Sequence, residues 1–351
     1  RKKGHETLEL ALRDAYTADD SSPTRYSNAL ENEREQARCT EQLTRFSPDW
    51  ISLQFVPYAL HPRGLPANLP AFLEAVSGRW QWQVMFHEIW IGCKHGSPFK
   101  ERLVGMAQRR LIAKSMRAIQ PAVVHSHATP YRALLNKLDL KTSPLPLFGN
   151  IPIVLANGYT DELDESLDKR IAAILGWNEA ELNEAHLGGI FGTLHPEWPS
   201  EPLLENLRHA AKREARRIGL IHFGSIGEAG YLWRRLMQGN DKHLRLGALG
   251  RLSAEEASRL MQRLHFGIAT SPRSLIEKSG SATAMLEHGL PVLVNRHDVS
   301  YPDVPAMGEL PDALLHDAES RLPNDFFTLP KRSPASRLDA VCEQFLAALQ
   351  A

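Results

Sequence analysis

Short apolar runs alternate with longer amphipathic stretches along the first half of the chain. Buried strands are predicted at residues 51–58, 82–86 and 122–126, and helices at 69–76 and 99–119 between them. Strands that alternate with helices in this way are typical of βαβ units, which build a parallel sheet. The first half therefore predicts an α/β domain.

The same rhythm returns after residue 188. Strands are predicted at 189–193, 218–223, 266–270 and 291–295, and helices at 202–217, 232–238, 254–263, 281–288 and 337–349. Between the halves, residues 140–152 carry three prolines, which is typical of a linker, and residues 160–176 form an acidic amphipathic helix that we expect to be peripheral.

The predicted fold class is α/β, with two Rossmann-like domains facing each other across a cleft. The expected domains are an N-terminal one over residues 1–150 and a C-terminal one over 189–330, joined by a linker at 151–188 and followed by a closing helix within 331–351.

The start of the chain has an unusual order of elements. Residues 1–5 are typical of the end of a helix, with Gly4 as the capping glycine, and residues 6–11 of a strand. A Rossmann domain normally begins with a strand and a glycine-rich turn before its first helix. The sequence is therefore expected to be truncated at its N-terminus, with the first strand missing and an open slot beside the strand at 8–10.

Composition and charge exclude several classes of function. Lys and Arg number 41 and Asp and Glu also number 41, so bulk charge does not attract nucleic acid. Cys39, Cys93 and Cys342 are widely spaced, which favours a reducing, cytoplasmic compartment over a disulfide framework. No apolar run approaches the roughly 18–20 residues of a membrane span, although peripheral contact with a membrane stays open.

The most informative stretch is residues 266–294, which predict a strand, a loop, a helix, a turn and a second strand. The loop contains Lys278, Ser279, Gly280 and Ser281 directly before the helix. A helix N-terminus offers unpaired N–H groups and partial positive charge, Gly280 permits close approach, Ser281 is a suitable N-cap and Lys278 adds a full charge. This predicts a cradle for a phosphate or diphosphate; an ordinary capped helix with a surface lysine is the alternative.

This stretch, with its GLPVLV turn, resembles the donor-site segment of GT-B glycosyltransferases, particularly the retaining family 4. In that family a Glu-x7-Glu motif lies here, and its first glutamate is near the donor sugar. The resemblance implies this catalytic role for Glu277. Met285 stands where the second glutamate belongs, so Glu287 becomes the candidate for the ribose contact, with a capping partner as its alternative.

Residues 190–207 resemble the first strand and helix of the C-terminal GT-B domain, where the chain passes close to the donor diphosphate. The resemblance implies diphosphate contacts for Gly192 and Thr193, and a ribose or cleft position for His195, which an ordinary loop histidine would also explain. A weaker signal is the GxxGxxG spacing at 221–230, which also fits a tight turn into a helix.

In the first half, polar residues follow the predicted strands, at the edge where ligands bind open α/β sheets. His87 and Glu88 come directly after the strand at 82–86. The resemblance implies a cleft-facing histidine here, so His87 is a catalytic candidate and Glu88 an acceptor-side or orienting group. Three further acceptor-side candidates are Tyr58, His61 and Arg63, with a loop that caps the sheet as the alternative.

No metal site is expected. His125 and His127 have a suggestive spacing, but neither a third ligand nor an Asp-x-Asp motif accompanies them. Metal-independent chemistry fits the resemblance, because helix dipoles and basic residues can replace Mg²⁺ at a leaving diphosphate. Lys278 would act there alone or with Arg251 or Arg273.

The implied function is a hexosyltransferase-like enzyme, without a cofactor, that moves a sugar from a nucleotide diphosphate sugar to an unidentified sugar or glycan acceptor, with retention. Two other functions stay open. One is a nucleotide-sugar epimerase on the same scaffold, and the other is a non-catalytic GT-B module that binds a glycan or a nucleotide.

Overall fold

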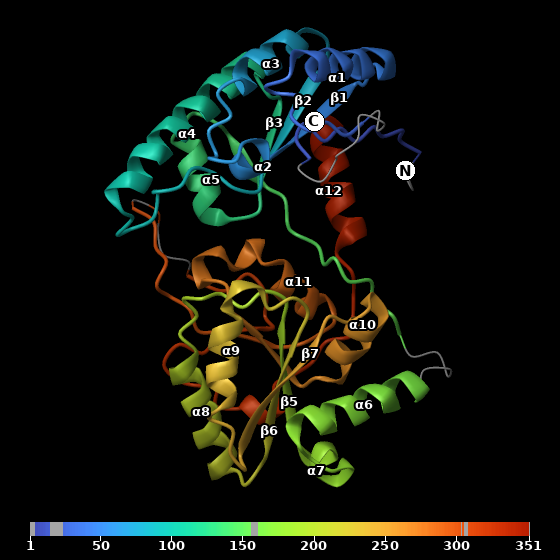
Figure 1. The fold of residues 1–351 in the computed structure, drawn as a ribbon, viewed down its shortest axis with the longest axis vertical. Helices are drawn as coiled ribbons and strands as arrows, with labels where there is room; N and C mark the ends of the chain where they lie inside the picture. Colours follow the sequence, from blue (N-terminus) through green and yellow to red (C-terminus); the bar gives the residue numbers. More distant parts are fainter. Residues whose placement is uncertain (1–3, 15–23, 156–160, 303, 305–307, 351) are drawn as a thin grey trace. The chain divides into compact units, whose positions relative to one another are not determined.

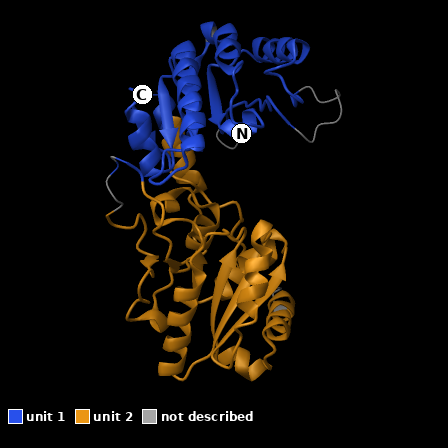
Figure 2. Ribbon diagram, turned by 60° about the vertical axis from the view of Figure 1, so that its left-hand side comes forward, with its two compact units in different colours: residues 1–145, 301–304, 347–351 blue, residues 146–300, 305–346 orange. Residues whose placement is uncertain are grey.

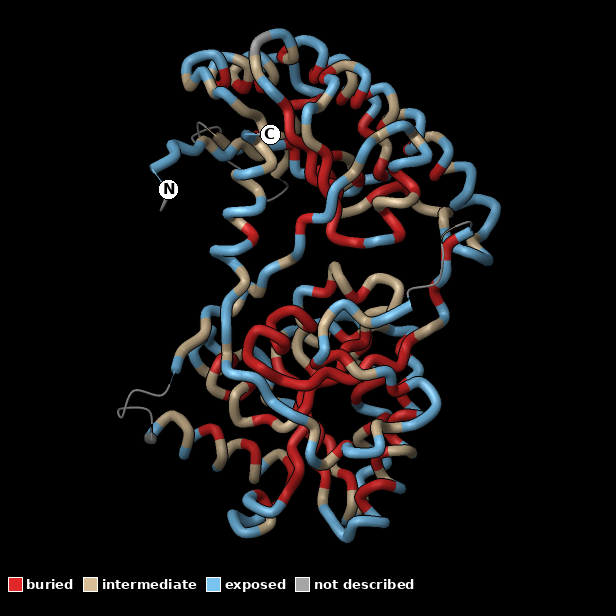
Figure 3. The backbone as a smooth tube through the Cα atoms, turned by 180° about the vertical axis from the view of Figure 1, so that it is seen from behind, coloured by how far each residue is buried: buried red, intermediate tan, exposed pale blue. Residues whose placement is uncertain are grey.

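The chain forms two compact units in a computed structural model that describes residues 4–14, 24–155, 161–302, 304 and 308–350. Unit 1 contains residues 1–145, 301–304 and 347–351, and unit 2 contains residues 146–300 and 305–346 (Figure 2). Each unit has its own parallel sheet, and the buried residues concentrate around these strands (Figure 3). The predicted fold class, α/β with two parallel sheets, is confirmed.

Unit 1 has a parallel sheet in the order β1-β2-β3-β4, of which Figure 1 labels the first three strands. Its strands are β1 (Trp50–Phe55), β2 (Gln81–Phe86), β3 (Val123–Ser126) and β4 (Thr142–Pro144). Its helices are α1 (Glu33–Phe46), α2 (Pro57–Leu60), α3 (Leu69–Val76), α4 (Phe99–Ile119) and α5 (Thr129–Asn136), with a 3-10 turn η1 (Ser77–Arg79). Because the spatial order follows the chain order, right-handed crossovers place α3, α4 and α5 on the same face of the sheet.

Unit 2 has a parallel sheet in the order β10-β9-β8-β5-β6-β7. Its strands are β5 (His186–Phe191), β6 (Ile218–Phe223), β7 (Leu244–Gly250), β8 (Phe266–Ala269), β9 (Val292–Val294) and β10 (Leu315–Asp317). The first strand, β5, lies between β6 and β8, so the chain order runs outward on both sides. This is the doubly wound Rossmann order, and its switch point lies between the carboxyl ends of β5 and β8.

Helices and 3-10 turns connect the strands of unit 2. They are α6 (Asp161–Leu175), α7 (Glu179–Glu184), α8 (Ser200–Arg213), η2 (Gly227–Ala229), α9 (Gly230–Met237), α10 (Ala254–Arg263), η3 (Arg273–Lys278), α11 (Gly280–Glu287) and η4 (Phe326–Thr328). The last helix, α12 (Leu338–Gln350), has residues in both units. Within the described ranges, every helix is too short or too polar to span a bilayer.

The acidic helix α6, expected to be peripheral, packs into the core of unit 2. Its residues Leu167, Ile171 and Leu175 are at most 3% exposed. The acidic face is also engaged, because Asp164 pairs with Arg259 and Asp168 with Arg263 on α10. An acidic helix looks solvent-facing in the sequence when the arginines that neutralise it lie almost a hundred residues away. The expected linker 151–188 therefore lies within unit 2.

Three expectations in the first 58 residues are wrong: a strand at 6–11, a slot beside it, and a strand that runs on to residue 58. Residues 6–10 form no strand; only Ala11 makes a single bridge, to Arg25, so no slot exists beside a strand at 8–10. The expected helix end at residues 1–5 falls largely outside the described residues. The strand expected at 51–58 ends at Phe55, because Pro57 lacks an N–H for the sheet and begins α2 instead.

The glycine of the GLPV turn has a structural role that a substitution can measure. Gly289 has a φ of +81°, and a Cβ atom added there would lie 1.8 Å from the carbonyl oxygen of Arg332. We expect Gly289→Ala to lower the free energy of unfolding by roughly 2–5 kcal/mol, from left-handed strain and overpacking together. Denaturant unfolding measures this. Gly280→Ala is the control at the other end of α11, because nothing lies within 4 Å of its added Cβ; equal losses would contradict the explanation.

Candidate functional site

The loops after β5, β6 and β7 stack on one another at the carboxyl edge of the unit 2 sheet. The N–H of Gly192 donates to the carbonyl of Phe223 at 2.8 Å, and the N–H of Gly224 donates to Gly250 at 2.8 Å. The N–H of Leu194 donates to Ile226 at 3.2 Å. These backbone bonds hold the predicted diphosphate residues Gly192 and Thr193 at the edge beside the switch point.

The GxxGxxG glycines permit this close stacking. A Cβ atom added to Gly224 would lie 3.2 Å from the Cα of Gly192, and one added to Gly227 would lie 2.9 Å from Cγ2 of Thr193. Both glycines have positive φ, and Gly227 begins the short turn that leads into α9. In the structure these glycines therefore serve the turn and the packing of the loops.

The segment after β8 completes the switch point from the other side. The hydroxyl of Thr270 donates to the carbonyl of Thr193 at 3.4 Å. The Cβ of Ser281 lies 3.9 Å from the position that a Cβ on Gly192 would occupy. The structure therefore brings together residues that lie about ninety positions apart in the sequence.

The N-cap of α11 differs from the expectation by two residues. Ser279, not Ser281, caps the helix, and its Oγ accepts from the N–H of Ala282 at 3.4 Å. Ser281 lies in the first turn, where its hydroxyl is 3.4 Å from that of Ser279. The hydroxyl of Ser271 adds a bond to Ser279 at 2.9 Å. Three hydroxyls thus gather at this helix end.

The N-terminus of α11 can receive an anion. Gly280 is exposed, and no atom lies within 4 Å of a Cβ added there. The backbone N–H groups of Gly280 and Ser281 donate to no described residue. Unpaired N–H groups and the helix dipole together favour a negatively charged oxygen at this point.

Lys278 and Glu277 end the 3-10 turn η3 and directly precede Ser279. Both side chains are half-buried. Arg273, one of the two expected helpers of Lys278, is directed elsewhere: its Nη2 donates to the carbonyl of Gly308 at 2.6 Å, and its Nε lies 3.4 Å from a carboxylate oxygen of Asp317. Lys278, two residues before Gly280, is the basic residue nearest in sequence to the N-terminus of α11.

His222 supports this edge and was not anticipated from the sequence. Its Nε2 donates to the carbonyl of Gly192 at 2.7 Å. The side chain is 1% exposed, and burial lowers its pKa, so the ring is neutral near pH 7. This bond fixes the backbone of Gly192. The one sequence signal for His222 is its position, one residue before the end of the buried strand β6.

A buried arginine lies near the expected cleft residue His195. The Nδ1 of His195 accepts from the N–H of Glu197 at 3.2 Å. Arg296 is 1% exposed and pairs with Glu197 at 2.6 Å and with Asp298 at 2.8 Å. Burial would raise the pKa of Asp298, but hydrogen bonds and the charge of Arg296 hold it below its usual value. The pair with Glu197 joins the segments after β5 and β9, which sequence spacing does not reveal.

Glu287 is the expected ribose contact, with a capping partner as the alternative. In the structure its carboxylate accepts from backbone N–H groups, as a capping partner does. The carboxylate is 2% exposed, and Oε1 accepts from the N–H of Gly149 at 2.9 Å and from that of Arg337 at 3.1 Å. The residue also ends α11, about 10 Å along the helix from Gly280. In this structure Glu287 holds together two distant segments of unit 2.

In unit 1, the candidate His87 follows β2 and is half-buried. Its Nε2 lies 2.7 Å from Oε1 of Gln54, and its Nδ1 lies 3.3 Å from Nε2 of His127. Glu88, the next residue, is also half-buried. The structure thus joins His87 to His127. From the sequence, His127 is a candidate only for metal binding, because of its spacing from His125. Among the described residues, no group of three or more His, Cys, Asp or Glu could hold a metal ion.

The other acceptor-side candidates lie after β1. Tyr58 is in α2 and is 41% exposed. The Nδ1 of His61 accepts from the N–H groups of Arg63 at 3.1 Å and Leu65 at 3.3 Å, and its Nε2 is 3.6 Å from Glu31. His61 therefore organises the turn, as in the alternative of a loop that caps the sheet.

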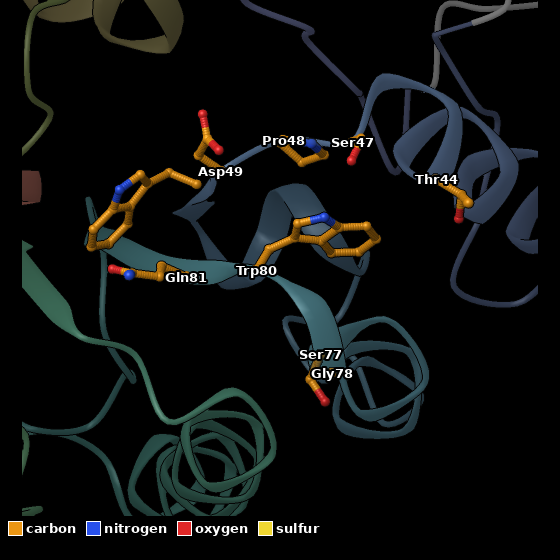
Figure 4. Close-up of a pocket in the computed structure, with 9 residues that line it drawn as sticks. Thr44, Ser47, Pro48, Asp49, Ser77, Gly78, Trp80 and Gln81 are labelled. Carbon is orange, nitrogen blue, oxygen red and sulfur yellow. The ribbon is translucent and has the colours of Figure 1, made fainter.

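A pocket of about 600 Å³ opens at the opposite, amino edge of the unit 1 sheet (Figure 4). Two indoles, those of Trp50 and Trp80, contribute to its lining together with hydroxyl and amide groups. Among the lining residues whose side chains the structure describes, Asp49 is the one that carries a charge.

Comparisons with known proteins gave structural similarity alone. No protein family model matches the chain, and no curated protein matches it. Among solved structures, it is similar to Anabaena HepE in complex with UDP and glucose, with 14% identity and a TM-score of 0.47 over 75% of this chain and 63% of that one. It is also similar to TarM, with 14% identity and a TM-score of 0.45 over 90% of this chain and 53% of TarM. A third similar structure is the α,α-trehalose 6-phosphate synthase of Burkholderia multivorans, with 14% identity and a TM-score of 0.45 over 77% of this chain and 61% of that one.

The chain thus spans less than two thirds of the length of each of these three proteins. Their similarity is too low to transfer an activity to this chain. The fold class rests instead on the two parallel sheets of the structure itself.

Proposed function

We propose that the chain is a GT-B glycosyltransferase that uses a nucleotide diphosphate sugar and holds the diphosphate at the carboxyl edge of unit 2. The observation that carries this proposal is the meeting of two segments at the switch point of a doubly wound sheet. Gly192 and Thr193 come from the end of β5, and Ser279, Gly280 and Ser281 come from the start of α11. In open α/β sheets, ligands bind at this place.

The groups present suit an anion that gains charge during a reaction. The N-terminus of α11 supplies two N–H groups without partners among the described residues, and Lys278 supplies a full positive charge nearby in the chain. Both interactions strengthen as negative charge develops on a departing nucleoside diphosphate. Such a site stabilises the leaving group without a metal ion.

The remaining roles follow from the resemblance to the retaining family 4. Glu277 and His87 are the proposed catalytic residues, at the donor sugar and at the reacting centre. Tyr58, His61, Arg63 and Glu88 are the proposed acceptor-side groups, and His195 is a proposed cleft residue. A sugar or glycan acceptor, retention of configuration and a cytoplasmic location belong to the same proposal.

A glycine substitution tests the binding site separately from the fold. We expect Gly280→Val to change the free energy of unfolding by less than about 0.5 kcal/mol, because Gly280 is exposed and has open space around it. Its branched side chain would cover the N–H groups and weaken the binding of a nucleoside diphosphate at least tenfold, about 1.4 kcal/mol. Calorimetric titration with UDP, GDP and ADP measures this.

Gly78→Val is the matched control for this substitution. Gly78 also has open space around it and lies in unit 1, so its substitution should leave nucleotide affinity unchanged. Equal affinity of the wild type and Gly280→Val for every nucleotide that binds would place the diphosphate elsewhere.

Catalysis requires a second measurement, made with the nucleotide sugar whose nucleoside diphosphate binds best. A glycosyltransferase releases the diphosphate, by transfer to an acceptor or by slow hydrolysis, and it leaves the configuration of the donor sugar at C2 unchanged. Release of an epimerised sugar nucleotide would favour the epimerase, and tight binding without turnover would favour the binding module.

A further inference from the structure

One face of the unit 1 sheet carries a row of polar side chains. Successive side chains of a strand point to opposite faces, and paired residues share a face. Ser52 pairs with Gln83, and Met85 pairs with both Gln54 and His125, so their side chains lie on the same face. His87 and His127 continue the same alternation just beyond the ends of β2 and β3.

Hydrogen bonds connect this row from end to end. From His127 the chain of bonds passes to His87 at 3.3 Å, to Gln54 at 2.7 Å, to Ser52 at 2.7 Å, to Gln83 at 2.6 Å and to His125 at 3.2 Å. Gln83 and His125 are at most 1% exposed, whereas Ser52 and Gln54 are exposed and His87 is half-buried. The row therefore leads from a water-accessible histidine to a buried one.

A backbone carbonyl fixes the tautomer at the His127 end. Nδ1 of His127 lies 2.8 Å from the carbonyl oxygen of Leu145, which can only accept, so Nδ1 carries the proton. In neutral His127, Nε2 then holds a lone pair, and the bond at 3.3 Å requires His87 to donate from its Nδ1. Neutral His87 therefore has its lone pair on Nε2, the atom that faces Gln54.

The amide of Gln54 can satisfy His87 in either protonation state. Its nitrogen donates to the Nε2 lone pair of neutral His87, and after a half-turn its oxygen accepts from the Nε2–H of the imidazolium. The hydroxyl of Ser52 and the amide of Gln83 can reverse in the same way. If all three reverse, the nitrogen of His125 that faces Gln83 changes from donor to acceptor.

We infer that His87 exchanges a proton through Nε2 and that His127, Gln54, Ser52 and Gln83 are positioning residues that link its protonation to the tautomer of His125. With His87 neutral, the bonds run from His125 Nδ1–H toward His87. When His87 takes a proton from water at Nε2, every bond from Gln54 onward reverses. His125 then gives up its Nδ1 proton and takes one at Nε2, both by exchange with water, so it becomes the Nε2–H tautomer with no net gain of a proton. This inference stands apart from the proposed transfer reaction.

Two charged residues of the described part of unit 1 lie next to this row. Arg132 donates to the carbonyl of His127 at 2.6 Å, and Glu88 follows His87 in the chain. Burial lowers the pKa of His125, so this ring resists protonation. The tautomer of His125 is thus a readout of the protonation of His87 that a merely structural role would not move.

Long-range ¹H–¹⁵N NMR of histidine-labelled protein tests the inference without any substrate. At pH 8 we expect the Nδ1–H tautomer for both His87 and His125. As the pH falls to 5, His87 should become doubly protonated, and His125 should change to the Nε2–H tautomer with the same midpoint. A His87 that is Nε2–H at pH 8, a His87 that does not titrate, or a His125 that keeps one tautomer throughout would each overturn the inference.

Substitution of Gln54 tests the link itself. Gln54 is exposed, so Gln54→Leu should fold; we expect His87 still to titrate in this variant, while His125 no longer changes tautomer with it. Gln81→Leu is the control, because Gln81 is an exposed glutamine on the neighbouring strand β2 that takes no part in the row. A change in His125 that survives in Gln54→Leu would show that the signal does not pass through this amide, and would also overturn the inference.

Discussion

Replacement of Lys278 by alanine is expected to lower kcat/KM for a nucleotide sugar by about 100- to 1,000-fold, the usual effect of losing one preorganised donor at a developing charge. The departing diphosphate carries more negative charge than the bound donor, so the lysine should act more strongly in the transition state than in the ground state. Nucleotide affinity should therefore fall less than kcat/KM. Steady-state kinetics and calorimetric titration on the same variant measure both quantities.

Two companion variants sharpen this experiment. Glu277→Gln should reduce turnover more than nucleotide affinity if the carboxylate faces the donor sugar. Arg273→Ala is the control for the loss of a cation from the same 3-10 turn, because its guanidinium is directed to Gly308 and Asp317. Wild-type turnover in Lys278→Ala would show that the segment 278–281 serves only as a helix cap and that the donor binds elsewhere.

His186 is expected to make the protein sensitive to acid. Its ring lies 5.4 Å from that of Phe266, 5.1 Å from Phe326 and 5.0 Å from Phe327. Burial, and then the nearby His265, lower the pKa of His186 to about 3. The unfolded chain binds a proton near pH 6.5, while the folded chain stays unprotonated, so stability falls as the pH drops below about 6.5.

Between pH 6.5 and 5 this one group should cost about 2 kcal/mol of unfolding free energy, at roughly 1.4 kcal/mol per pH unit. His186→Phe should remove that part of the loss, because a phenyl ring does not titrate and no described residue bonds to Nε2 of His186. Denaturant unfolding at both pH values measures the difference. The exposed His209→Phe is the control; an equal acid sensitivity in all three proteins would show that His186 does not titrate as proposed.

The sequence predicted the elements whose local pattern is strong. Helices α3, α4 and α10 have the predicted bounds, because their apolar residues recur at helical spacing and α10 begins with a serine cap. Strand β7 was missed because LRLGALG contains two glycines and lacks β-branched residues, so its assignment depends on pairing with β6. The α6 helix was placed outside the core because its arginine partners are distant in sequence.

The candidate site was predictable only as separate segments. Serine, glycine and lysine before a helix indicate an anion site from local rules alone, and the structure shows that this helix end meets Gly192. Periodicity predicts a helix from residue 281, whereas α11 begins at Gly280, so it could not identify Ser279 as the N-cap. His222 and the row from His127 to His125 were not found, because their partners are set by sheet register, which a single sequence does not specify.

The division of the chain also determines when each unit can be completed during synthesis. Unit 1 includes Tyr301, whose ring packs edge-on against Tyr131 at 6.3 Å, although 155 residues of unit 2 precede it in the chain. The ribosome must therefore make all of β5 to β9 before Tyr131 receives this partner. A fragment that ends at Leu145 would lack this ring contact, so cutting at the apparent boundary should not release two complete folding units.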